Sequence, residues 1–452
     1  MSYNSSAPTT SRALQTDRYE ITMIDAALHS GVANRKAVFE VFTRGLPPGR
    51  RYGVVAGTGR VIESICSFRF SEADVAYLET LGLSADALGW LADYRFNGNI
   101  WGYAEGDFYG AWSPVLTVQS TFAEAVVLET MILSTFNHDS AVAAAASRMV
   151  TAAAGRRTIE MGSRRTDPDA AVSAARAAAI GGIDATSNLE AGRRYGLETA
   201  GTAAHAFTMA HLDEATAFTS QIAAQGVATT LLVDTYDIPN GLHTAVEVAR
   251  TFGATGPGGV RIDSGDLVAE THAARSLLDS LGAHSTRIVV SGDLDEYRIS
   301  ELVRAGAPID VFGVGTSLVV GSGEPTASLT YKLVAIEDTG GSMQGVAKRS
   351  AGKAGNAGCK YVERTIESDD PDDPPNARVV EHLTVGRNLD QSAVQVKFIE
   401  RGEVVCESTV AMARERHRKA RAQLLALGGL QLDRGNPAVV PSVDAANKWT
   451  AQ

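Results

Sequence analysis

The fold is decided by four short apolar runs in the middle of the chain: TTLLVD (229–234), GVRID (259–263), RIVVSGD (287–293) and IDVFGVGT (309–316). Each run is rich in β-branched residues, as is typical of strands buried on both faces of a sheet. Helical patterns separate the runs, one from Asp266 to Leu281 and another from Asp295 to about Gly306. Strands that alternate with helices at this spacing predict repeated βα units, so we expect an α/β fold with an irregular α/β barrel.

Polar residues stand where each predicted strand ends. Asp234, Asp263, Asp293 and Gly315 lie at the carboxyl ends of the four runs, and this edge of a barrel is where active sites form. Each aspartate taken alone is as easily explained as the cap of the next helix. Arg261 favours a site, because it shares a strand face with Asp263 and buried charges must serve each other or a ligand.

Composition narrows the class of protein. The chain has 452 residues, 44% of them hydrophobic, and a formal net charge of −11. An acidic balance argues against non-specific binding to nucleic acid or to an anionic membrane, since both need a positive field. Three scattered cysteines exclude a disulfide framework, and we find neither a signal peptide nor an apolar run long enough to span a bilayer. We expect a cytoplasmic protein with small-molecule substrates.

The pattern along the chain predicts four segments. Residues 1–155 form an N-terminal α+β domain with helices at Ala123–Leu133 and Ala141–Ala154, and residues 156–330 form the barrel. Residues 331–410 return to the α+β domain through β-like runs such as AVQVKFIER (393–401), and residues 411–452 form a C-terminal helix and tail.

Other short motifs carry polar chemistry but are weak alone. TDRYEITM (16–23) places Tyr19 at a helix start beside Asp17, where half-buried packing and a helix cap are the ordinary explanations. EMGSRRT (160–166) has an arginine pair on a turn, which suits a carboxylate or phosphate. Thr186, Ser187 and Asn188 form a neutral polar run, and His205 lies among small residues.

Taken in order, these segments resemble the nicotinate phosphoribosyltransferase family of the type II phosphoribosyltransferase group. The matching landmarks run from Thr16 to about Lys360: TDRYEITM, ETMILSTFNHDS, GSRRT, ATSN, GTAAHAF, VDTYD, VRIDSGDL, SGDLDE, FGVGTSL, TYKLV and AKRS. The resemblance implies a sandwich-like α+β domain, built from N-terminal and later segments, joined to the irregular barrel. It also implies a homodimer whose active sites are shared between subunits.

The resemblance implies roles for individual residues. Tyr19 would stack on the pyridine ring from the partner subunit, and Arg164 and Arg261 would bind carboxylate or phosphate groups. Asp263 would lie near the ribose as a ligand of Mg²⁺ that is bound through the diphosphate. His205 would be phosphorylated by ATP, with Asp234 as its orienting carboxylate.

Further residues follow from the same resemblance. Ser187 would belong to the substrate pocket, and the phosphoribosyl cradle would consist of Gly292, Asp293, Gly313, Gly315 and Thr316. Asn137 and His138 match a landmark whose role is structural or adjacent to the site. Two features depart from the family pattern: Met161 stands where an aromatic residue is usual, and Lys348 and Lys353 lie in a looser basic segment than the usual phosphate loop.

The implied reaction is the ATP-coupled transfer of phosphoribosyl from 5-phosphoribosyl 1-diphosphate (PRPP) to nicotinate, with Mg²⁺. The products would be nicotinate mononucleotide, ADP, phosphate and diphosphate. Transfer to nicotinamide is the nearest alternative, and a non-catalytic barrel that binds a phosphate ligand is the alternative from another class. An unrelated barrel lyase would need a lysine at a barrel strand end, and none of the four runs ends in one.

Overall fold

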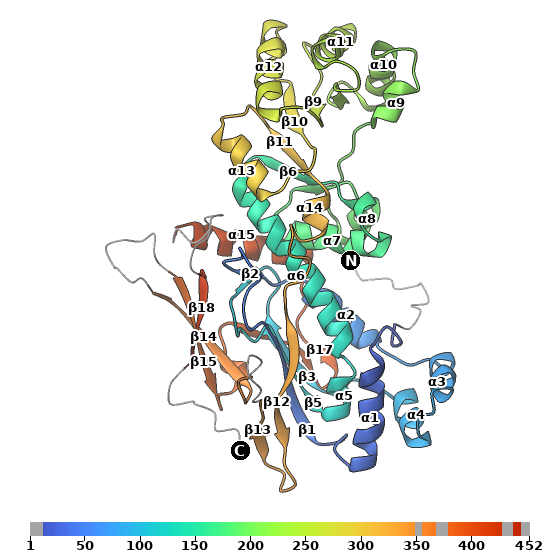
Figure 1. The fold of residues 1–452 in the computed structure, drawn as a ribbon, viewed down its shortest axis with the longest axis vertical. Coiled ribbons are helices and arrows are strands. Elements are labelled where there is room, and N and C mark those ends of the chain that lie inside the picture. Colours follow the sequence, from blue (N-terminus) through green and yellow to red (C-terminus); the bar gives the residue numbers. More distant parts are fainter. Residues whose placement is uncertain (1–11, 349–354, 368–377, 427–436, 444–452) are drawn as a thin grey trace. The chain divides into compact units, whose positions relative to one another are not determined.

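The computed structural model describes residues 12–348, 355–367, 378–426 and 437–443, and it divides the chain into two compact units (Figure 1). Unit 1 consists of residues 1–140 and 326–452, and unit 2 consists of residues 141–325. The first boundary, between residues 140 and 141, falls inside helix α6 (Glu129–Ala152). The four segments proposed from the sequence, with limits at 155, 330 and 410, stay a prediction.

Unit 2 is built on an open, curved sheet of parallel strands in the order β7-β6-β11-β10-β9-β8, which is half of a barrel. The strands are β6 (Arg157–Glu160), β7 (Ala185–Thr186), β8 (Thr230–Leu232), β9 (Gly259–Ile262), β10 (Arg287–Val290) and β11 (Val311–Val314). The last four coincide with the four apolar runs, so the predicted parallel α/β architecture is confirmed. The sequence prediction missed β6 and β7, and β7 is only two residues long.

The helices of unit 2 follow its strands, with α11 packed against β9 and α12 against both β9 and β10 (Figure 1). They are α7 (Pro168–Ile180), α8 (Leu189–Tyr195), α9 (His205–Met209), α10 (Glu214–Gln225), α11 (Ile238–Thr251), α12 (Leu267–Ser280), α13 (Glu296–Arg304) and α14 (Thr316–Val319).

Separate aspartates cap these helices. The carboxylates that accept N-cap hydrogen bonds at α11, α12 and α13 belong to Asp237, Asp266 and Asp295. The three aspartates at the strand ends therefore do not cap the next helix, and that alternative is wrong. Their side chains are therefore available for a site at the carboxyl edge of the sheet.

Unit 1 contains a seven-stranded sheet in the order β13-β12-β1-β5-β3-β16-β17. Its strands are β1 (Lys36–Phe42), β3 (Asn99–Tyr103), β5 (Leu116–Thr121), β12 (Thr330–Glu337), β13 (Met343–Gly345), β16 (Gln395–Glu400) and β17 (Glu403–Val404). β1 pairs antiparallel with both β5 and β12, and the rings of Phe39 and Tyr331 stack 4.9 Å apart across the second pair. Segments that precede and follow unit 2 in the sequence thus build one sheet, as the resemblance implies.

Ion pairs link a smaller sheet to the rest of unit 1, and this sheet consists of β14 (Lys360–Glu367), β15 (Arg378–Val385) and β18 (Val439–Val443). The Lys360 ammonium lies 2.6 Å from the Glu40 carboxylate, and both side chains are buried. The Arg364 guanidinium contacts the Asp107 and Glu381 carboxylates, each at 2.8 Å. Partners this close neutralise each other, so these pairs serve to hold the later segment in place. Strands β2 (Gly53–Val54) and β4 (Phe108–Tyr109) form a separate pair.

The helices of unit 1 are α1 (Arg18–Ser30), α2 (Thr58–Ser67), α3 (Glu72–Glu79), α4 (Ala85–Ala92), α5 (Phe122–Val126) and α15 (Val410–Ala426), with the first part of α6. The sequence placed one helix at Ala123–Leu133 and another at Ala141–Ala154. In the structure α5 ends at Val126, and α6 then runs unbroken from Glu129 to Ala152. This correction has a tertiary cause, because the start of α6 is fixed by a side chain of α1.

That side chain is the fully buried Glu20. Its Oε1 accepts a hydrogen bond from the backbone N–H of Thr130 at 2.9 Å and another from the Thr130 hydroxyl, and its Oε2 accepts one from Thr16. Asp17 occupies the N-cap position of α1 without a side-chain cap bond, so its expected capping role is wrong. Burial raises the pKa of Glu20 to about 7, although the hydrogen bonds from Thr130 and Thr16 act to lower it.

We predict that Glu20→Gln becomes increasingly stable relative to the wild type as the pH rises from about 5 to about 8. A carboxyl whose pKa is higher in the folded than in the unfolded state binds protons more tightly when folded, so its contribution to stability falls as the pH rises. A pKa of about 7 against an ordinary 4.5 corresponds to a change on the order of 3 kcal/mol. Urea unfolding across this range measures it. The exposed Glu79→Gln is the control, and a pH-independent difference for Glu20→Gln would contradict the prediction.

Candidate active site

The carboxyl ends of β8 and β9 are tied together by Asp234. Its side chain is only 2% exposed, and its Oδ2 accepts hydrogen bonds from the backbone N–H of Asp263 at 2.8 Å and from the Ser264 hydroxyl at 2.9 Å. Its other oxygen, Oδ1, is buried and has no hydrogen-bond partner among the described residues. A desolvated carboxylate oxygen of this kind favours a nearby positive charge or donor.

The imidazole of His205 lies near that oxygen. Its Nε2 lies 4.0 Å from Asp234 Oδ1, which is too long for a hydrogen bond but close enough for charge stabilisation, and its Nδ1 lies 3.2 Å from the Thr235 hydroxyl. The imidazole is 39% exposed at the first residue of α9. An accessible imidazole beside a carboxylate is suited to act as a base or a nucleophile. The structure therefore brings together His205 and Asp234, as the sequence predicted.

Arg261 and Asp263 contact each other on the end of β9, also as predicted. Arg261 Nη2 lies 3.4 Å from Asp263 Oδ1, its Nε donates to the Ser291 hydroxyl at 3.0 Å, and its Nη1 donates to the Thr202 hydroxyl at 3.1 Å. Ser291 in turn donates to Asp263 Oδ1. Burial alone would raise the pKa of Asp263, but the Ser291 hydrogen bond and the Arg261 charge outweigh it and hold this pKa below its ordinary value.

The arginine turn after β6 is organised by Glu160, which the sequence analysis did not single out. This buried carboxylate accepts hydrogen bonds from the Gly162 backbone N–H and from the Thr186 hydroxyl, the latter at 2.5 Å, and burial raises its pKa. The Ser187 backbone N–H donates to the Glu160 carbonyl at 2.8 Å. The exposed Arg164 on its 3₁₀ turn and the polar run at Ser187 are therefore held at neighbouring strand ends.

The predicted cradle lies on the turns after β10 and β11. Gly292 has φ +103°, and a Cβ there would lie 2.3 Å from the Asp263 carbonyl oxygen, so this turn requires glycine. Asp293 is exposed with φ +45°, and Gly313 packs against the Met161 thioether, which occupies the position expected for an aromatic ring. Gly315 and Thr316 follow β11, where Thr316 begins α14. The cradle residues share the sheet edge that carries Arg261 and Asp263.

The remaining predicted residues belong to unit 1. Tyr19 lies in the first turn of α1 and is 45% exposed, and burial together with the charge of Glu129 raises its pKa. His138 Nδ1 lies 2.8 Å from the Asp139 carboxylate. Asn137 is structural. Its side-chain amide donates a hydrogen bond to the Leu329 carbonyl and accepts hydrogen bonds from the Leu329 N–H and the Thr326 hydroxyl. Lys348 is exposed, and Lys353 lies outside the described residues.

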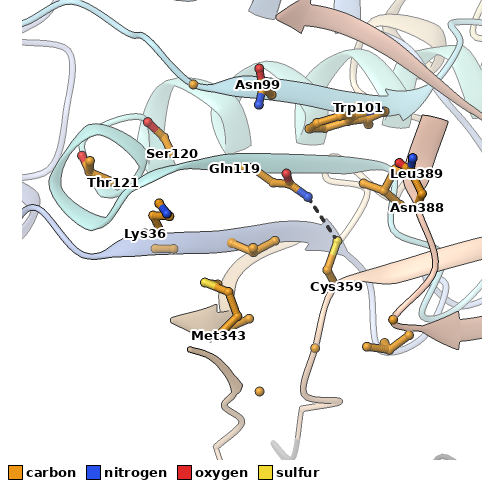
Figure 2. Close-up of a pocket in the computed structure, with 18 of the residues that line it drawn as sticks. Lys36, Asn99, Trp101, Gln119, Ser120, Thr121, Met343, Cys359, Asn388 and Leu389 are labelled. Atoms are coloured by element: carbon orange, nitrogen blue, oxygen red, sulfur yellow. Dashed lines mark hydrogen bonds between the residues drawn. The ribbon is translucent and has the colours of Figure 1, made fainter. Parts of the chain in front are cut away.

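Unit 1 also has an open cavity of about 1920 Å³ that contains none of the predicted site residues. Figure 2 shows Lys36, Gln119 and Trp101 lining it from β1, β5 and β3, with Cys359 opposite and hydrogen-bonded to Gln119 at 3.6 Å. Both lysines that line it are paired within the protein, Lys36 with Glu337 and Lys397 with Asp390 and Glu400.

Comparison with known proteins identifies the family. Residues 14–137 match the nicotinate phosphoribosyltransferase N-terminal domain, and residues 157–375 match the nicotinate phosphoribosyltransferase family. The chain belongs to the nicotinate phosphoribosyltransferase family. It is 48% identical over 449 residues to nicotinate phosphoribosyltransferase pncB1 of Mycobacterium tuberculosis, with 94% of each chain covered. It is 38% identical to nicotinate phosphoribosyltransferase of Bacillus subtilis, over 73% of this chain and 68% of that one.

Solved structures agree on the fold. Human nicotinic acid phosphoribosyltransferase superposes with a TM-score of 0.77 at 22% identity, over 96% of this chain and 98% of that chain. Nicotinate-nucleotide pyrophosphorylase from Pyrococcus furiosus superposes with a TM-score of 0.71 at 24% identity, over 92% and 95%. The family and the fold class predicted from the sequence are both confirmed.

The donor set fits a magnesium ion only in part. Among the described residues, no group of three or more histidine, cysteine, aspartate or glutamate side chains is placed to hold a metal ion. Asp263 could supply one ligand, since both of its protein contacts fall on Oδ1 and the side chain is 32% exposed. Mg²⁺ commonly takes one or two carboxylates and completes its shell with substrate phosphates and water. The site thus fits an ion that is carried mainly by a diphosphate.

Sequence reasoning missed Glu160, Thr202 and Ser291. Ser291 directly follows β10 in the same motif as Gly292 and Asp293, so its position at a strand end was a usable signal. Thr202 and Glu160 gave no such signal, because their hydrogen-bond partners, Arg261 and Thr186, are 59 and 26 residues away.

Proposed function

We propose that this chain catalyses the ATP-coupled transfer of a phosphoribosyl group from PRPP to nicotinate, as a ligase-type enzyme of NAD biosynthesis and salvage. The products are nicotinate mononucleotide, ADP, phosphate and diphosphate. Family membership supports the transfer to nicotinate, since relatives that are 48% and 38% identical to this chain over the aligned residues carry that name. The observation that carries the proposal is the meeting of Arg261, Asp263, Asp234 and His205 at one sheet edge.

The proposed reaction requires that the substrates are held in place and that the charge developing on the ribose and the leaving diphosphate is stabilised. The pyridine nitrogen of nicotinate attacks the anomeric carbon while the bond to the diphosphate oxygen breaks, and the diphosphate leaves with the bonding electrons. Positive charge develops on the ribose, so a carboxylate such as Asp263 stabilises it, while the Arg261 guanidinium binds a phosphate. Mg²⁺, when bound, neutralises the leaving diphosphate. Holding the reactants in line supplies much of the remaining acceleration, without a covalent sugar intermediate.

We predict a strong preference for nicotinate over nicotinamide in purified protein. The exposed Arg164 turn and the neutral run at Ser187 offer a cation and uncharged donors for a carboxylate. A misplaced charge in a dry pocket costs several kcal/mol, which corresponds to roughly a thousandfold in preference. Product formation from each base with PRPP, Mg²⁺ and ATP measures the ratio, and Ser187→Asp should erode it. Equal turnover of both bases would favour the nicotinamide alternative, and no turnover would favour a non-catalytic barrel.

The coupling to ATP rests on His205. An imidazole can attack the γ-phosphate of ATP, and a nearby carboxylate stabilises the cation that forms. The bond between the γ-phosphorus and the bridging oxygen breaks, ADP leaves, and water later hydrolyses the phosphohistidine. Support comes from the 4.0 Å separation of His205 Nε2 and the orphaned oxygen of Asp234. Phosphorylation would place negative charge beside the diphosphate site, which can couple ATP hydrolysis to product yield.

We predict that His205→Ala abolishes ATP hydrolysis and the stimulation by ATP, while a slow ATP-independent transfer survives. Incubation of the wild type with γ-labelled ATP should give an acid-labile, base-stable adduct that maps to His205. His138 and His211 are the internal controls, since their hydrogen-bond partners are Asp139 and the Phe207 carbonyl rather than Asp234. Label on either of them, or full ATP coupling in His205→Ala, would refute the assignment.

We further propose a homodimer in which Tyr19 completes the site of the partner subunit. Support comes from the family resemblance and from the exposure of an aromatic ring in the first turn of α1. A mixture of Tyr19→Ala and Arg261→Ala proteins should recover activity, because each hybrid dimer retains one intact site. Subunit exchange is verified by mass spectrometry, and a mixture that stays inactive after exchange would count against a shared site.

The location of the protein stays a prediction. None of the helices in the described part of the chain combines the length and hydrophobicity needed to cross a bilayer. We expect the cytoplasm, where the substrates PRPP and ATP are made.

A further inference from the structure

We propose that Ser291 is a positioning residue that limits the direct contact between Arg261 and Asp263 to one hydrogen bond and so preserves the arginine fork for PRPP. This inference rests on the proposed function, because it assigns PRPP as the ligand of Arg261. Ser291 follows β10, next to β9 in the sheet, and its side chain is buried. Its hydroxyl stands between the two charged groups and bonds both of them.

The chemistry of a hydroxyl allows this double role. Ser291 accepts a hydrogen bond from Arg261 Nε at 3.0 Å and donates its own hydrogen to Asp263 Oδ1. A hydroxyl has one donor and two acceptor sites, so both bonds form at once. Arg261 Nε is thereby occupied by Ser291, so the direct contact between Arg261 and Asp263 Oδ1 is the single bond from Nη2 at 3.4 Å.

The consequence lies in the remaining donors of Arg261. A guanidinium has five N–H groups, and the contacts with Ser291, Thr202 and Asp263 use one on each nitrogen. Among the described residues, one N–H on each terminal nitrogen is left for a ligand. One donor on each of two adjacent nitrogens is what bidentate binding of a phosphate requires.

Without the Ser291 hydroxyl, the Arg261 guanidinium and the Asp263 carboxylate would be each other's nearest hydrogen-bond partners. Arg261 Nη2 and Asp263 Oδ1 are already 3.4 Å apart, and a small rotation would give a bidentate arginine–carboxylate pair. Such a pair would consume the donors meant for phosphate and neutralise the carboxylate near the ribose. Ser291 therefore holds two opposite charges close together while limiting their direct contact to a single hydrogen bond.

The test compares PRPP binding by the wild type, Ser291→Ala, Ser291→Cys and Ser291→Thr, measured by calorimetry without nicotinate or ATP. Loss of a hydrogen bond to a charged group predicts a rise of about tenfold in the Kd and KM for PRPP in Ser291→Ala. The KM for nicotinate should change less than about twofold. Ser291→Cys, whose thiol is a weak partner, should behave like alanine, while Ser291→Thr should restore binding because it keeps the hydroxyl.

A double-mutant comparison separates positioning from general destabilisation. Lysine has no Nε–H fork, so Ser291→Ala should add less than about twofold to the PRPP Kd in an Arg261→Lys background. Additive losses would overturn the proposal, as would unchanged PRPP binding in both Ser291→Ala and Ser291→Cys. Ser300→Ala, on α13, is the control for a serine outside the site.

Failure of the proposed function gives a different result. A wild type that binds PRPP but transfers nothing to nicotinate would refute the function and leave the role of Ser291 to be decided by the binding series. A wild type that does not bind PRPP would overturn both.

Discussion

Parallel strands that share one direction and register place all their carboxyl ends at a single edge of the sheet, and the site of this protein depends on that constraint. In unit 2 the ends of β8, β9 and β10 carry Asp234, Asp263 and Ser291. Asp234 reinforces the alignment, because its buried carboxylate holds the backbone N–H of Asp263 at 2.8 Å. Displacing one strand would therefore disturb several functional groups at once.

Buried charges are satisfied in two ways in this structure. Some are paired directly, as for Lys360 with Glu40 in unit 1 and for Arg148 with Glu296 in unit 2, and such pairs cancel. At the edge of the unit 2 sheet, hydroxyl groups stand beside the charges, including those of Thr202 and Ser291. A hydroxyl satisfies a desolvated charge without cancelling it, so the charge stays available for a ligand. This difference distinguishes the structural ion pairs from the site.

Carboxylates that are buried without a cation organise the approaches to the predicted binding residues. Glu160 holds the turn that carries Arg164, and Glu20 fixes the start of α1, next to Tyr19, against the start of α6. Burial raises the pKa of both groups. Each accepts hydrogen bonds from a backbone N–H and a hydroxyl, so each acts as a fixed acceptor that joins two segments distant in the sequence.

The sequence by itself determined the strands β8 to β11, the parallel α/β class, the family, and the places of Asp234, Arg261 and Asp263. These follow from local patterns, because strand periodicity and residues at strand ends are written in consecutive positions. Only the tertiary structure decided that β6 and β7 join the sheet, that α6 is unbroken, and that Asp237, Asp266 and Asp295 are the caps. It alone revealed the partners of Glu20, Glu160 and Ser291, since the choice among distant hydrogen-bond partners is made by packing and leaves no periodic trace in the chain.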